Sequence, residues 1–88
     1  MKIPVKNPKA KIIEFKGTLY ASVEDSLFEI DRAALNILKL CDGKNDVDKI
    51  VDIITQKIGF PREEVERVVT NILKELEEKK IIFWKESS

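Results

Sequence analysis

The chain has 88 residues, of which 43% are hydrophobic and 36% are charged, so it is long enough for one folded domain with a single modest core. Its 16 basic and 16 acidic residues cancel, which leaves none of the basic surplus with which nucleic-acid binders neutralise phosphates. We find no signal peptide and no apolar run of membrane-spanning length, and therefore expect a cytoplasmic protein without membrane contact.

Residues 1–10 contain Pro4, Pro8 and several lysines, and are expected to form an extended, partly mobile, basic lead-in. The single domain is expected over residues 11–85. Residues 1–18 hold five lysines against Glu14 alone. This local excess indicates either an ordinary flexible basic arm or one that attracts an acidic peptide.

Residues 11–30 have the pattern of a small antiparallel meander. Apolar and polar residues alternate over 13–15 and 19–23, and the turn signal Lys16-Gly17-Thr18 lies between them, which predicts a β-hairpin. A second turn at residues 24–26 leads into a third strand, Leu27–Ile30.

Residues 31–43 predict a helix that is apolar over most of its surface. Asp31 is a suitable N-cap and Gly43 a suitable C-terminal stop. One apolar face contains Ala34, Ile37, Leu38 and Cys41, and Leu35 and Leu40 flank it. A helix with apolar residues on so many sides must be covered on several of them, so we expect it at the centre of the fold. Cys41 is expected to be a small buried hydrophobe and not a nucleophile.

Two further helices are predicted after this one. Asp46 caps the first, which ends at Gly59, and Pro61 opens the second. The second carries a stripe at helical spacing that consists of Val65, Val68, Val69, Ile72, Leu73 and Leu76. The apolar segment Ile81–Trp84 is expected to pack back as a short extended piece, and residues 86–88 to fray. The predicted fold is α+β and winged-helix-like, a three-stranded antiparallel sheet followed by three helices.

The residues that most catalytic sites require are missing. The chain has no histidine and no CxxC, HExxH, GxGxxG or Walker motif. Carboxylate pairs such as Glu63/Glu64 and Glu77/Glu78 lie among basic residues on a predicted solvated face, where a catalytic pKa shift has no cause. We therefore expect no enzymatic activity, no cofactor and no metal site.

The order and spacing of short motifs from about Pro8 to Ile82 resemble the PqqD-like family, which comprises recognition elements of ribosomally made, post-translationally modified peptides. The motifs are Pro8-Lys9, Gly17, Ile30-Asp31 before Ala33-Ala34, Leu40-Cys41-Asp42-Gly43, Asp46-Val47 with Ile50-Val51, Val65–Leu76 and Ile81-Ile82. The chain departs from the family pattern at Asp31, where asparagine is usual, and at Ala33, where a hydroxyl residue is frequent.

The resemblance implies a function in peptide delivery. Such proteins are not catalysts; they hold the leader of a precursor peptide and present its core to a modifying enzyme, commonly a radical SAM enzyme. The peptide is expected to add as a strand beside the third strand, against the third helix.

The sequence provides a physical basis for this mode, because the third strand of a meander has only one neighbour and leaves an edge for β-augmentation. The predicted contacts are the backbone of Leu27, Phe28, Glu29 and Ile30, the apolar side chains of Val69 and Leu73, and the cations Arg67 and Lys74 for acidic leader residues. The alternatives are that Val69 and Leu73 belong to the core and that Arg67 and Lys74 lie on a solvated face.

Three other interpretations stay open from the sequence. A winged-helix DNA-binding regulator has a similar helical half, although residues 61–80 carry six Glu against five Lys or Arg. A structural subunit is the second, with Ile81–Trp84 docking on a larger enzyme. The oligomeric state is the third open point. The protein is expected to be either a monomer or a weak homodimer in which the free strand edges of two copies pair with each other.

Overall fold

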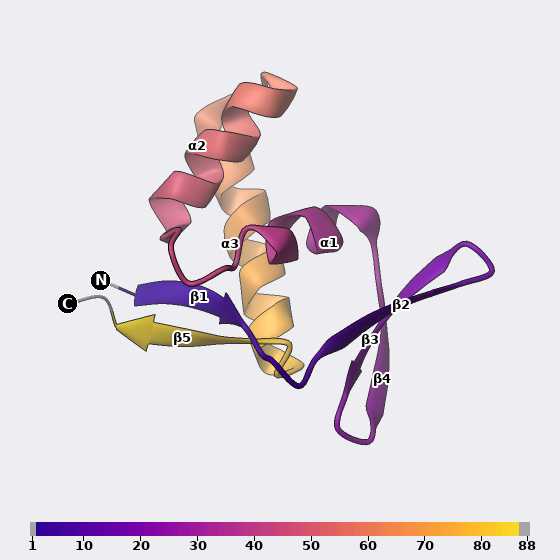
Figure 1. Ribbon diagram of the computed structural model, residues 1–88. Coiled ribbons are helices and arrows are strands. Elements are labelled where there is room, and N and C mark those ends of the chain that lie inside the picture. The colour runs from indigo at the N-terminus through magenta and orange to yellow at the C-terminus, as the bar shows by residue number, and fades with distance from the viewer. Residues whose placement is uncertain (1, 87–88) are drawn as a thin grey trace.

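In the computed structural model, which describes residues 2–86, two small antiparallel sheets lie on either side of a group of three helices (Figure 1). The elements in chain order are β1 (Lys2–Lys6), β2 (Lys11–Phe15), β3 (Thr18–Val23), β4 (Ser26–Ile30), α1 (Arg32–Lys39), α2 (Val47–Ile58), α3 (Arg62–Glu78) and β5 (Ile82–Glu86). The predicted α+β class and the order of three strands and three helices are confirmed.

The three-stranded sheet has the order β2-β3-β4 and is the predicted meander. The β2–β3 turn places Lys16 and Gly17 at φ values of 53° and 80°, a left-handed pair whose twist matches that of the flanking strands. Leu19, Ala21 and Val23 of β3 are buried, and the residues between them are half-buried. The period-2 pattern therefore turns one face of this sheet toward the core.

The expected lead-in is extended but is part of the fold. Residues 2–6 form β1, which pairs antiparallel with β5 and places Pro4 opposite Trp84. Ile3 and Pro4 are buried, so β1 is packed into the fold and is not a free arm. Glu86, expected to fray, is the last residue of β5; Met1, Ser87 and Ser88 lie outside the described residues. Sequence reasoning missed this pairing because the two strands come from opposite ends of the chain.

Helix α1 begins as predicted and ends earlier than predicted. The Asp31 carboxylate accepts the Ala34 N–H at 2.8 Å. The helix stops at Lys39, four residues before Gly43, because the next two N–H groups donate to carbonyls three residues back, as in a 3₁₀ turn. Cys41 therefore lies beyond the helix, and its carbonyl accepts the Lys6 N–H of β1 at 2.9 Å.

Helix α3, and not α1, is the central helix. Its 17 residues pack against α1, α2 and β5, whereas α1 has only 8 residues. The side chains that α3 buries recur at spacings of three and four: Val65, Val69, Leu73 and Leu76. The greater length and the continuous stripe let α3 cover more of the core than the more apolar but shorter α1.

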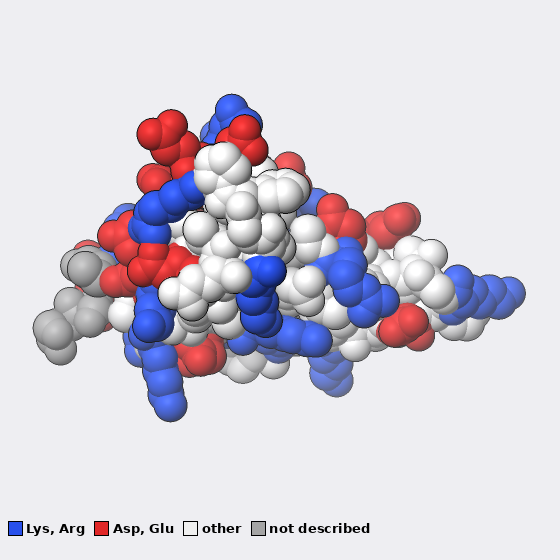
Figure 2. Space-filling model, turned by 90° about the horizontal axis from the view of Figure 1, so that it is seen from above, with Lys and Arg blue, Asp and Glu red and all other residues white. Residues whose placement is uncertain are grey.

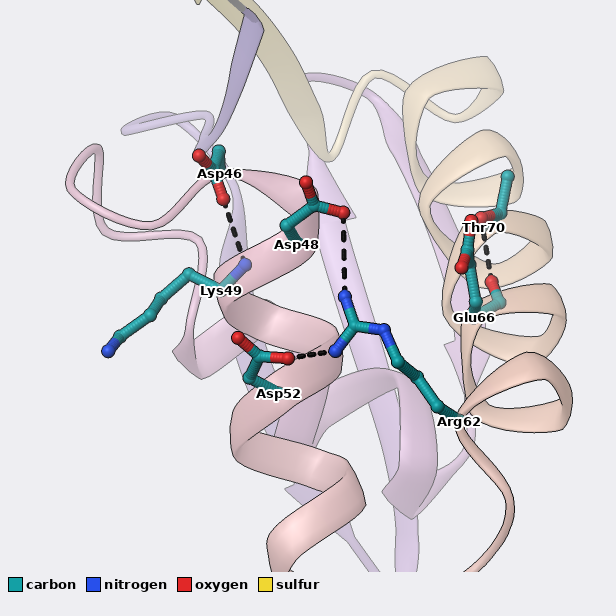
Figure 3. A network of polar contacts seen from close by, with 7 residues as sticks. All are labelled: Asp46, Asp48, Lys49, Asp52, Arg62, Glu66 and Thr70. Atoms are coloured by element: carbon teal, nitrogen blue, oxygen red, sulfur yellow. Dashed lines mark hydrogen bonds and ion pairs between the residues drawn. The ribbon is translucent and has the colours of Figure 1, made fainter.

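The ends of α2 and α3 are held by local polar contacts (Figure 3). The Asp46 carboxylate accepts the Lys49 N–H at 2.8 Å, and Gly59 ends α2 at φ 71°, so both predicted caps are confirmed. Arg62, the first residue of α3, contacts Asp48 at 3.6 Å and also pairs with Asp52, both on α2. These charges are exposed, so the pairs orient the two helices but stabilise the fold only slightly.

Burial and the adjacent negative charge of Asp42 raise the pKa of the Cys41 thiol to about 12. We expect Cys41 to be unreactive toward a disulfide reagent at pH 8 in the folded chain and reactive in denaturant. The unfolded thiol, with a pKa near 9.0, loses its proton before the folded one does. The contribution of the Cys41 thiol to the free energy of unfolding is thus complete below pH 9 and is lost between pH 9 and 12. Urea titrations across this range should show that decline, and a Cys41→Ala variant should lack this component.

Candidate functional site

Strand β4 has a free edge. It pairs with β3 on one side, and no strand within residues 2–86 pairs with its other side. The two-residue turn makes Ser26 the first hydrogen-bonded residue of β4, so the register gives Phe28 and Ile30 the next bonded positions toward β3. The N–H and C=O groups of Leu27 and Glu29 consequently point away from β3, toward the free edge.

A small cavity lies where the C-terminal end of β4 approaches the C-terminal half of α3. We call this the strand groove. Its apolar lining consists of Ile30, Ala34, Ile72 and Leu76, and its charged lining of Glu29, Asp31, Glu75 and Lys79. Its volume of about 90 Å³ equals roughly three water molecules, which is room for one small aliphatic side chain.

Lys79 connects the two walls of the strand groove. Its Nζ lies 5.9 Å from the centroid of the Phe28 ring, so the end of α3 contacts β4 through a cation–π pair. Side chains of a strand added beside β4 alternate between the two faces of the sheet, and every second one faces α3. The arrangement thus combines backbone pairing along the edge with an apolar pocket next to it.

All four predicted residues lie on the edge strand β4, but only the backbone groups of Leu27 and Glu29 point to its free side, because those of Phe28 and Ile30 face β3. The four predicted α3 residues do not line the strand groove. Val69 and Leu73 are each 1% exposed, so their side chains belong to the core. Arg67 lines a separate groove between the helices, and Lys74 is exposed and lines neither groove. The most apolar face of a helix is the one that turns into the core, so the structure agrees with the alternative that Val69 and Leu73 are core residues.

The α3 residues that do line the strand groove were missed as site residues. Ile72, Leu76 and Lys79 have the spacing i, i+4, i+7 and share one face of the helix. Ile72 and Leu76 were recognised only as members of the apolar stripe. No local signal separates them from core positions, since the distinction depends on where β4 comes to lie.

The alternative docking segment, Ile81–Trp84, is mostly internal. Ile81 and Ile82 are 0% and 2% exposed, Trp84 is half-buried, and Phe83 is the member with a large exposed surface, 47%. Among residues 2–86 we find no group of three or more acidic, cysteine or histidine side chains placed to hold a metal ion. Over the same residues, no helix has the length and apolar character needed to cross a membrane.

Comparison with known proteins agrees with this geometry. Residues 18–82 match the family described as "Coenzyme PQQ synthesis protein D (PqqD)". The chain is 34% identical over 58 residues to the "PqqA binding protein" of Gluconobacter oxydans (strain 621H), a stretch that covers 66% of this chain and 60% of that protein. The match thus spans less than two thirds of the relative's length.

Two solved structures share the fold. TbiB1, solved in complex with the TbiA(beta) leader peptide, has a TM-score of 0.72 at 19% identity and covers 89% of this chain and 93% of that one. The PqqD truncation of Methylobacterium extorquens PqqCD, described as a stand-alone recognition element for ribosomally synthesised and modified peptides, has a TM-score of 0.75 at 22% identity, with coverage of 92% and 88%. The match over residues 18–82 shows that the chain belongs to the PqqD family, as the resemblance predicted.

Proposed function

We propose that this chain is a non-catalytic peptide chaperone that binds the leader of a ribosomally synthesised precursor peptide as an added strand on β4. It then delivers the peptide to a modifying enzyme, a radical SAM enzyme, in the cytosol. The observation that carries the proposal is the free edge of β4, which presents the backbone groups of Leu27 and Glu29 and, at Glu29, adjoins the strand groove. The name of the Gluconobacter relative and the leader peptide bound to TbiB1 support it.

The contacts at the β4 edge supply part of a useful affinity, about 3.5–9 kcal/mol before the cost of association, so further side chains of the leader must also contribute. A dissociation constant of one micromolar corresponds to about −8 kcal/mol. Leu27 and Glu29 each offer one N–H and one C=O, and each intermolecular bond contributes about 0.5–1.5 kcal/mol. An aliphatic side chain buried against Ile72 and Leu76 adds about 1.5–3 kcal/mol. We propose the half-buried Ile72 as the accessible part of the apolar wall, in place of Val69 and Leu73, with the buried Leu76 behind it. Lys79 is the one cation among the described residues of this lining, beside the acids Glu29, Asp31 and Glu75.

Hydrogen exchange tests this proposal residue by residue. In the free chain, the amides of Phe28 and Ile30 should exchange slowly because they bond to β3, whereas those of Leu27 and Glu29 should exchange fast. A precursor peptide encoded beside the gene for this chain should slow exchange at Leu27 and Glu29 at saturating concentration. The control is a variant of this precursor peptide in which every second one of its apolar residues is replaced by serine; it should not slow exchange at Leu27 and Glu29. Saturable binding that leaves these two amides fast would contradict strand addition.

We propose further that the protein is a monomer or a weak homodimer. A free edge can pair with the same edge of a second copy, and such pairing uses the same backbone groups as the leader. Sedimentation should therefore show that saturating peptide dissociates any dimer formed at high protein concentration.

A further inference from the structure

A second and larger groove lies between the three helices; it shares Ile72 with the strand groove but contains no β4 residue. We call it the helical groove; its volume is about 590 Å³. The apolar side chains that line it include Leu40, Ile54, Ile58, Phe60, Val68 and Ile72. Ile58, Phe60 and Val68 are 51%, 60% and 50% exposed, so a substantial apolar surface faces solvent. Such a surface on a small protein marks an interaction site.

The walls of the helical groove determine the conformation of what they bind. They consist of α1, α2, α3 and the loop at Phe60, and the backbone groups within a helix already bond to one another. The groove therefore offers side chains but no strand edge. An extended segment buried here would leave its own N–H and C=O groups unsatisfied, whereas an α-helix satisfies them internally.

The charged residues around the helical groove indicate which charge its binding partner should carry. Lys39, Lys57 and Arg67 line it together with a single acid, Glu64. None of the three cations forms an ion pair with another residue in the described range 2–86. Figure 2 shows uncharged side chains gathered over the helical part of the molecule, with both basic and acidic side chains around them; among the residues that line the groove, the cations are in excess.

A second copy of the chain is a poor occupant. A symmetric contact through this groove brings Lys39, Lys57 and Arg67 of one copy toward the same residues of the other, which like-charge repulsion opposes. An acidic partner gains from the same charges. The excess of cations over the single acid thus favours a different protein that carries Asp or Glu beside its apolar contact residues.

We propose that the helical groove binds an amphipathic helix of a partner protein, with apolar residues on one face and acidic residues along its flanks. This site is separate from the β4 edge, so the chain can hold a leader strand and a partner helix at once. The inference does not depend on leader binding, because the groove and its charges are present whatever β4 binds.

The probe is a synthetic helical peptide of about 18 residues, five turns long, with leucine at i, i+3 and i+7 positions and glutamate on both flanks. Titrated into the ¹⁵N-labelled chain at low salt, it should shift the amides of the groove-lining residues saturably and leave Leu27 and Glu29 unchanged. The same peptide with lysine in place of glutamate should bind about tenfold more weakly. Added salt should reduce the preference for the glutamate peptide, because the cations are exposed and screened, whereas the apolar contacts should keep both peptides bound.

Two charge reversals on α2 provide the matched comparison. Lys57→Glu, at the groove, should weaken binding of the glutamate peptide about three- to fivefold, and Lys49→Glu, exposed on α2 but outside the groove, should change it less than about twofold. Circular dichroism checks that both variants fold. The proposal is overturned by any of four results. These are equal binding of the acidic and basic peptides, equal effects of the two charge reversals, amide shifts confined to β4, and no saturable binding below about 1 mM.

Discussion

Replacement of Glu29 by proline is expected to weaken binding of the leader peptide by at least about tenfold while the chain stays folded. The Glu29 N–H points toward the free edge of β4 and takes no part in the pairing with β3. Proline is tolerated at such an edge position because no internal hydrogen bond is lost. The bound peptide, however, no longer receives the Glu29 N–H, so one of its carbonyl groups is left without a hydrogen bond. The cost of this unsatisfied carbonyl is larger than the energy of the lost bond itself.

Glu29→Ala is the matched control, because it removes the same carboxylate and keeps the N–H. Isothermal titration with a precursor peptide should give an affinity for Glu29→Ala within about threefold of the unchanged chain, since an exposed charge contributes little. Equal losses for the two variants would assign the effect to the side chain and contradict backbone pairing. Phe28→Pro should instead destabilise the fold, as its N–H bonds to β3.

The parts of the fold that were predictable are those that neighbouring residues decide. Asp31 and Asp46 each accept an N–H three residues on, and Gly59 adopts the left-handed conformation that ends α2. The alternation along β3 likewise places its buried face correctly. These features follow from short-range geometry, which a single sequence contains in full.

The parts that were not predictable depend on which distant segments meet. The β1–β5 sheet joins the two ends of the chain, and nothing near Lys2–Lys6 signals that partner. The proposed peptide site likewise depends on the packing of segments that are distant in the sequence. The free edge of β4 follows from the order of the strands, but the half of α3 that lies beside it is set by packing. Hence the predicted strand residues lie on the edge strand, whereas Val69 and Leu73 lie in the core.

The free edge and the helical groove differ in what they leave unsatisfied. The β4 edge exposes backbone groups and therefore suits an extended chain, whereas the helical groove exposes apolar side chains and cations and suits a structured acidic partner. Ile72 lines both grooves, so the two sites are neighbours along α3. The two proposals together place a bound peptide close to a second protein.

Adjacent residues of α3 allow packing and binding to be separated. Leu73→Ala, at a site 1% exposed, should lower the free energy of unfolding by about 2–5 kcal/mol, because it removes contacts and leaves a cavity. Ile72→Ala, at a half-buried site that lines the strand groove, should cost less than about 2 kcal/mol. Urea unfolding of both variants measures this difference.

Peptide affinity should follow the opposite order. Ile72→Ala removes part of the apolar wall and should weaken leader binding about tenfold, whereas Leu73→Ala, measured where it is still folded, should weaken it less than about threefold. The contrast works because the two side chains lie on different faces of one helix, and the small difference in helix propensity between Leu and Ile is much less than the expected effects. A larger loss of affinity for Leu73→Ala than for Ile72→Ala would contradict this proposal. It would indicate that the peptide contacts Leu73, as the sequence analysis predicted, on a face of α3 that is buried in this structure.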